Sequence, residues 1–220
     1  MGAKSYLFCD VKRFYEDSFF RPIQTSFLEN EGQSELEILK LDTVISQDFN
    51  IHHGKFDFER KQKGKVFGKV FSKFFEPLEF PIFYNENLNL CIIQTKSEAA
   101  LEFIRQLNSS NQFDLINCSI DFDKIIKRVP EISGAWIAGL KGQHLKTAGY
   151  FGPNVHLSPE YNDAIKRGEI SAMSIKWIDK DHIEYCVTIS KKGSITIYNN
   201  FDNHQQEFEF IIDIYLKLIK

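Results

Sequence analysis

Three apolar stretches near the C-terminal end, joined by very short connections, constrain the fold more than any other feature of the sequence. They span residues 170–178, 183–190 and 194–198, and the two connections are only four and three residues long. Apolar and polar residues alternate along the second stretch, as expected of a half-buried strand. Connections of this length are typical of β-hairpins, so the stretches predict consecutive antiparallel strands.

Other segments give the same kind of local signal. Further strands are expected at residues 6–11, 35–44, 88–93, 115–120, 132–138 and 145–151. Two interruptions are expected among the early strands: a turn at His53-Gly54 and a proline-containing break over residues 76–81. The Gly139-Leu140-Lys141-Gly142 stretch has the GxxG form of a phosphate-binding loop, but it is better explained as the tight turn of a hairpin.

Four helices are expected from their start signals and apolar spacing. Thr95 and Glu98 form a capping-box pattern ahead of a helix, and a short amphipathic helix follows Asp121 and ends at Pro130. Ser158-Pro159 opens a third helix, with the hydroxyl at the cap and proline in the first turn. Asp202, followed three residues later by Gln205, opens an apolar final helix.

The expected fold class is therefore α+β. We expect a mainly antiparallel sheet, or sheets, with helices packed on one face and the C-terminal helix docked across the sheet. Two subdomains are expected: a β-rich N-terminal part over residues 1–87 and an α+β C-terminal part over residues 88–220.

Charge is unevenly distributed along the chain. The formal net charge is −3, from 27 basic and 30 acidic side chains, so no global field would attract nucleic acid. Residues 55–75, however, contain seven basic and two acidic residues, a net charge of +5, so the other residues together carry a net charge of −8. The chain thus contains one locally basic segment.

That basic segment interleaves lysines with apolar side chains. Lys61, Lys65, Lys69 and Lys73 recur every four residues, and valines and phenylalanines follow the same rhythm. A helix would place lysine and apolar stripes side by side, whereas a strand would alternate cations with rings. In either form lysines can neutralise phosphates while exposed phenylalanines stack on bases. The competing interpretation is a structural element with a solvated, lysine-rich outer face. The candidate nucleic-acid-binding residues are Lys61, Lys63, Lys65, Lys69, Lys73, Lys124, Lys127 and Arg128.

The sequence contains no complete catalytic signature, and we expect no catalytic residue, metal site or cofactor. The four cysteines form no CxxC pair, and the six histidines lack the spacings of metal ligands. A metal-dependent nuclease would need Glu59-Arg60-Lys61 together with Asp48 or Asp42, but such Asp/Glu-x-Lys triplets also arise by chance.

The setting is expected to be the cytoplasm, without membrane contact. The N-terminus lacks the apolar core of a signal peptide, and no apolar run approaches the ~20 residues that span a bilayer. Cys91 and Cys118 lie in apolar runs and are expected to be buried free thiols.

The function expected from the sequence is a non-enzymatic interaction protein that binds nucleic acid non-specifically through the basic segment. Two alternatives remain open: a protein–protein adaptor or complex subunit without nucleic-acid contact, and the metal-dependent nuclease. An adaptor would use an exposed apolar patch, for which the aromatic loop at residues 149–154 is a candidate.

Overall fold

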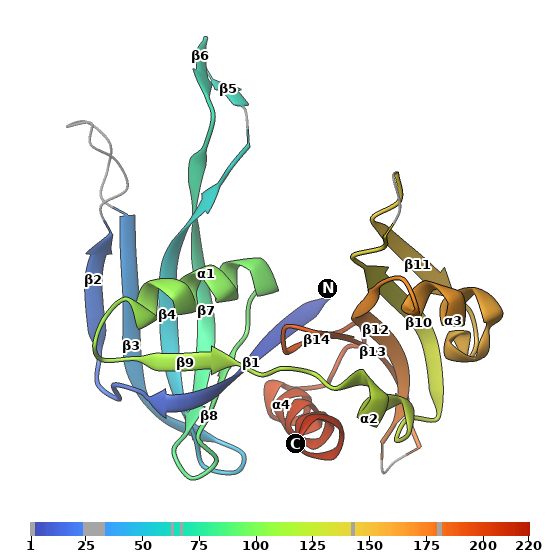
Figure 1. Ribbon diagram of the computed structural model, residues 1–220. Helices are drawn as coiled ribbons and strands as arrows, with labels where there is room; N and C mark the ends of the chain where they lie inside the picture. Colours follow the sequence, from blue (N-terminus) through green and yellow to red (C-terminus); the bar gives the residue numbers. More distant parts are fainter. Residues whose placement is uncertain (1–2, 24–33, 63, 67, 142–143, 180–181) are drawn as a thin grey trace. The chain divides into compact units, whose positions relative to one another are not determined.

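The computed structural model describes residues 3–23, 34–62, 64–66, 68–141, 144–179 and 182–220 (Figure 1). Its contacts form two compact units. Unit 1 comprises Met1–Phe8 with Asn117–Lys220, and unit 2 comprises Cys9–Ile116. Strand β1 (Lys4–Arg13) contributes its first residues to unit 1 and its last residues to unit 2. This grouping differs from the sequence-based division after residue 87, because it keeps residues 88–116 with the N-terminal strands.

Unit 2 is built on an antiparallel sheet with the strand order β1-β8-β7-β4-β3-β2. The strands are β2 (Phe19–Ile23), β3 (Ser34–Ile45), β4 (Phe49–Arg60), β7 (Phe74–Asn85) and β8 (Leu90–Ile93), and β9 (Asp114–Asn117) pairs with β1. Helix α1 (Ser97–Asn108) covers this sheet through Phe103, whose ring lies edge-on to Phe56 and Phe80 at 5.6 and 5.1 Å. These contacts place the unit's core between α1 and the even-numbered face of β4.

The two interruptions expected in unit 2 are wrong. β4 runs without a break through His53-Gly54, and β7 runs through the proline-containing segment. Gly54 is needed for close packing, because a Cβ there would lie 2.8 Å from the Phe80 ring. Pro81 accepts a hydrogen bond from the Gln94 amide at 3.1 Å, so its backbone faces away from β4 and its missing N–H costs no bond in the β4–β7 ladder.

The capping box expected before α1 does not form. The helix begins at Ser97 with Lys96 at the N-cap, and no side chain caps it. The helix itself is confirmed, with Ala100, Ile104 and Leu107 buried as its apolar spacing predicts.

Unit 1 is built on a second antiparallel arrangement, with the strand order β11-β10-β12-β13-β14-β1. The strands are β10 (Glu131–Ala138), β11 (Thr147–Phe151), β12 (Glu169–Ile178), β13 (Glu184–Ser190) and β14 (Ser194–Ile197). The three consecutive antiparallel strands expected near the C-terminus are confirmed, and so is the hairpin around Gly139, where φ is +67°.

The helices of unit 1 begin largely where the sequence indicates. They are α2 (Phe122–Ile126), the 3-10 turn η1 (Val155–Leu157), α3 (Pro159–Ile165), α4 (His204–Ile214) and the π-helical turn η2 (Tyr215–Ile219). The Ser158 hydroxyl accepts from the Tyr161 amide at 3.2 Å, which confirms that cap. The final helix is capped one residue later than expected, by Asn203, whose side chain accepts from the Gln206 amide at 2.9 Å.

The expected class, a mainly antiparallel sheet structure with a few helices and a C-terminal helix, is confirmed. Helix α4 packs Phe210 against Tyr185, with ring centroids 4.3 Å apart. The sheet dominates, and the expectation that helices pack on one face is met only in part, because the hairpin extension at residues 60–74 projects past α1 without a covering helix (Figure 1). Within the described ranges, no helix has the length and apolar character needed to cross a bilayer.

Candidate nucleic-acid interface

The basic segment is the outer part of a long β-hairpin. β4 and β7 pair from Asn50↔Tyr84 to Arg60↔Phe74, and beyond that pair the chain forms a narrow two-stranded ribbon. Its strands are β5 (Gly64–Val66) and β6 (Lys69–Phe71), and Gly68, with φ at +80°, occupies the turn between them. We call residues 60–74 the arm; it projects beyond the rest of unit 2 (Figure 1).

Of the two forms that the lysine spacing allows, the structure has the strand form, interrupted by the turn. The register pairs Lys65 with Val70 and Val66 with Lys69. The four-residue lysine repeat therefore does not form a helical stripe, and the lysines are divided between the two strands of a ribbon. Lys63, another of the candidate residues, lies outside the described residues.

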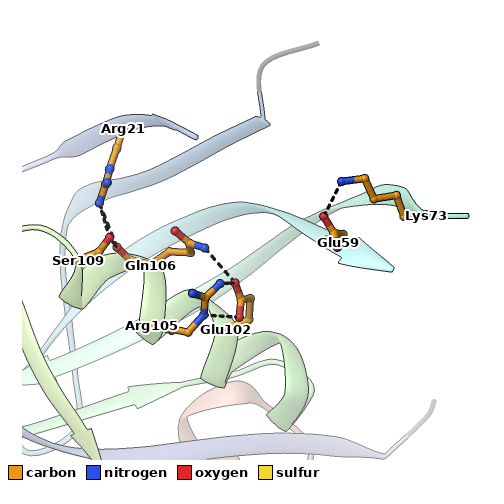
Figure 2. Close-up of polar contacts among 7 residues, drawn as sticks. All are labelled: Arg21, Glu59, Lys73, Glu102, Arg105, Gln106 and Ser109. Atoms are coloured by element: carbon orange, nitrogen blue, oxygen red, sulfur yellow. Dashed lines mark hydrogen bonds and ion pairs between the residues drawn. The ribbon is translucent and has the colours of Figure 1, made fainter. Parts of the chain in front are cut away.

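The cations at the base of the arm are held by carboxylates of unit 2. Arg60 pairs with Glu76 at 2.6 Å and with Glu98 at 3.4 Å, and its guanidinium lies 4.6 Å from the centre of the Phe58 ring. On the neighbouring strand, Lys73 pairs with Glu59 at 3.1 Å (Figure 2). Both cations are thus neutralised internally and brace the start of the arm.

Beyond this base, the arm carries positive charge without compensation in its own sequence. Between Arg60 and Lys73 lie four lysines and no acidic residue. Lys61 is exposed and, among the described residues, makes no ion pair. The apolar side chains of Val70 and Phe74 are 74% and 46% exposed. The arm therefore combines lysines with solvent-facing apolar groups on a thin two-stranded ribbon.

Further cations of unit 2 gather near the C-terminal end of α1, and sequence reasoning did not single them out. The Arg21 guanidinium, on β2, donates to the Gln106 carbonyl at 3.2 Å and to the Ser109 hydroxyl at 2.6 Å (Figure 2). Arg105 forms a bidentate contact with Glu102, and this contact, more than the nearby Gln106 amide and Lys61 charge, lowers the pKa of Glu102. These arginines serve local structure, so the arm remains the principal basic feature of the unit.

The second candidate group lies in unit 1. Lys124 and Lys127 are exposed on and after α2, while Arg128 donates to the Lys217 carbonyl at 2.7 Å. Asp121, which caps the helix, and Asp123 are exposed beside them. The carboxylates offset much of the local positive charge, so α2 is a weaker candidate for anion binding than the arm. The two groups belong to different units, and each is a separate candidate.

The acids invoked for a nuclease are not brought together. Glu59 lies near the end of β4, whereas Asp48 lies just before its start, and eleven extended residues span about 36 Å. Asp42, on β3, is close to the Asp48 end, because Val44 pairs with Asn50. No cluster of three or more potential metal ligands occurs among the residues that the structure describes.

One histidine, both tryptophans and two cysteines take part in packing. His52, which adjoins the turn expected at His53-Gly54, is fully buried in β4, and burial lowers its pKa. Trp177 is buried, while Trp136 lies edge-on to Phe151 at 5.2 Å. Cys91 and Cys118 are buried and form no disulfide, as expected.

Comparison with known proteins gives no family to which this geometry can be related. No protein-family model matches the chain, and no curated protein matches it either.

Proposed function

We propose that this protein binds nucleic acid without strong sequence preference, through the arm at residues 60–74, and that it does so without catalysing a reaction. The observation that carries the proposal is the arm itself: a projecting hairpin extension with four lysines beyond its ion-paired base, no acidic residue and exposed apolar side chains. A lysine-rich outer face on a core element, the competing interpretation, would not require the chain to extend beyond its own sheet.

The dimensions of the arm suit a polyanion. A two-stranded β-ribbon is narrow enough to enter the major groove of duplex DNA, where lysines on both strands reach the flanking phosphates. Contacts of this kind set affinity and position and carry little sequence information. Phe74 and Val70 offer apolar surface to a groove wall or an unpaired base.

Because Arg60 and Lys73 are already paired with carboxylates, we expect four lysines to contact phosphates: Lys61, Lys63, Lys65 and Lys69. Four contacts on duplex DNA give a slope of about −3.6 in log K against log salt concentration, so raising salt from about 50 to about 200 mM should weaken binding about 150-fold. On a single strand the same four contacts should give about a 50-fold loss.

The test is fluorescence anisotropy with labelled duplex DNA, single-stranded DNA and RNA over this range of salt. Lys61→Glu/Lys65→Glu/Lys69→Glu should abolish binding at low salt. A matched control, Lys12→Glu/Lys166→Glu/Lys192→Glu, makes the same change of charge at exposed lysines elsewhere and should retain most of the affinity. Circular dichroism verifies that both variants are folded.

A second variant removes the arm without touching the rest of the hairpin. Arg60 and Phe74 lie directly opposite each other, so replacing residues 61–73 by Asn-Gly closes β4 and β7 with a two-residue turn. This variant should fold and should not bind. Equal binding by the arm and control variants, or no binding of the native protein to any of the three probes at low salt, would overturn the proposal and leave a protein partner as the remaining expectation.

The contribution of α2 is measured in the same assay. Lys124→Glu/Lys127→Glu should leave the salt slope unchanged if the arm is the whole site, and should reduce its magnitude by about two if those lysines also contact phosphates.

A further inference from the structure

Strand β11 is the outer strand of the unit 1 sheet, and among the described residues of this unit only β10 pairs with it. The Gly152 amide donates to the Ser133 carbonyl at 3.1 Å. Hydrogen-bonded and non-hydrogen-bonded pairs alternate along an antiparallel ladder, so Tyr150 and Ala148 also turn their backbone groups toward β10. Residues 147, 149 and 151 therefore direct their N–H and C=O groups away from the sheet.

This edge has none of the usual protection against pairing. Outer strands commonly carry charges, proline or a bulge, which discourage a second chain from adding to them. β2, the outer strand of unit 2, contains Arg21 and Pro22. β11 reads Thr-Ala-Gly-Tyr-Phe, without charge or proline, and its register with β10 has no shift. The contrast indicates that β11 is available for pairing with another strand.

Both ends of β11 carry exposed apolar groups. Beyond its C-terminal end lies an open groove of about 590 Å³, lined largely by apolar groups that include Tyr150, Phe151, Pro153 and Leu157. Phe151 and Leu157 are 69% and 70% exposed. Before its N-terminal end, Leu145 is 59% exposed. Leu145 and Pro153 each lie four residues from Gly149, at the middle of the strand.

We propose that a second copy of this chain pairs with β11 in antiparallel orientation, about a two-fold axis at Gly149. This register places Thr147 opposite Phe151 of the other copy. It is the register in which all three outward-facing residues of both copies form backbone hydrogen bonds with the other copy. Three hydrogen-bonded pairs, with two bonds in each, contribute about six backbone hydrogen bonds. The contact is isologous and closes as a dimer.

The same register accounts for the apolar groups at both ends. It brings the end of β11 that follows Leu145 in each copy to the end that leads into the groove of the other, so each copy supplies one leucine and receives one. Lys146 falls opposite Gly152, and like charges do not face each other across the new ladder. The self-complementarity of these positions identifies a second copy as the occupant, in preference to an unrelated peptide.

The test is sedimentation velocity on the full chain, freed of nucleic acid, at about 5 to about 200 µM, since dimer population depends on concentration. The mass should rise from 25.7 kDa toward twice that value. Leu145→Glu places a carboxylate at the groove that Glu160 also lines, and Thr147→Pro removes an outward-facing amide without costing a β10 bond. Each should weaken the dimer at least about tenfold. Leu41→Glu, at an exposed leucine of β3, should sediment like the native protein.

Cross-linking tests the register. Residues of a hydrogen-bonded antiparallel pair have Cα atoms about 5.5 Å apart, within the range of about 4.4–6.8 Å that a disulfide spans. In a Cys186→Ser background, which removes the exposed native thiol, Thr147→Cys and Phe151→Cys proteins should form a disulfide-linked pair when mixed and oxidised. Thr147→Cys mixed with Tyr198→Cys, another exposed aromatic position, should not.

A native chain that stays at 25.7 kDa over the whole range would overturn the proposal and leave the edge to a different extended segment. A dimer that neither β11 variant weakens, or one whose cross-link does not form, would overturn it as well, since the contact would then lie elsewhere. None of these outcomes depends on nucleic-acid binding by the arm.

Discussion

A buried carboxylate in unit 1 gives the most direct test of the physical reasoning. Glu207, on α4, is only 3% exposed, and it accepts hydrogen bonds from the Tyr6 hydroxyl and the Lys4 ammonium group of β1. Tyr6 is fully buried, and its pKa is raised first by that burial and then by its hydrogen bond to Glu207. The pair therefore joins the first strand of the chain to its last long helix.

The expected changes in the free energy of unfolding depend on which buried group loses its hydrogen-bond partner. Glu207→Met keeps the volume but leaves the Tyr6 hydroxyl buried and unsatisfied, so we expect it to lower the free energy of unfolding by about 3 kcal/mol. Tyr6→Phe leaves the carboxylate with Lys4 and should cost about 1–2 kcal/mol. The double variant removes both polar groups together and should be within about 1 kcal/mol of the native protein, which gives a coupling energy of at least about 3 kcal/mol.

The assay is equilibrium urea unfolding at about 25 °C and pH about 7, followed by tryptophan fluorescence. Both tryptophans, Trp136 and Trp177, lie in unit 1, so the signal reports on the unit that contains the pair. Lys4→Met is the control, because Lys4 is 41% exposed and its ion pair should contribute less than about 1 kcal/mol. A coupling energy below about 0.5 kcal/mol between Tyr6 and Glu207 would refute the reasoning.

Two further predictions concern unit 2. Because burial lowers the pKa of His52, the folded state holds this side chain neutral, while the unfolded state takes up a proton near pH 6.5. The free energy of unfolding should therefore be highest above that pH. Below it, the free energy of unfolding should fall by up to about 1.4 kcal/mol per pH unit. His52→Gln should flatten this dependence in urea titrations between pH about 7 and 5, and an unchanged slope would exclude His52 as its source. Gly54→Ala would place a Cβ 2.8 Å from the Phe80 ring and 2.9 Å from Ile82, and should lower the thermal unfolding midpoint, at a cost of about 1–3 kcal/mol. A midpoint equal to that of the native protein would contradict this prediction, since β7 would then shift to accommodate the added methyl group without loss of stability.

Local signals in the sequence determined most of the secondary structure. Ser158-Pro159 starts a helix because a hydroxyl cap and a fixed φ act within one turn, and the short connections near the C-terminus force neighbouring strands to pair. The basic character of the arm is likewise a property of sequence alone, since it depends only on which residues lie between 60 and 75.

The tertiary structure decided what depends on partners distant in the chain. His53-Gly54 has the composition of a turn, but it lies in a continuous strand because Phe80 and Ile82 require the space above Gly54. Pro81 is tolerated in β7 because its backbone faces away from β4. In each case a local preference of about 1 kcal/mol is outweighed by the pairing of two twelve-residue strands. That pairing energy comes from residues distant in the sequence, so it cannot be inferred from neighbouring residues. The free edge of β11 has the same origin, because an edge exists only once the order of strands in the sheet is set.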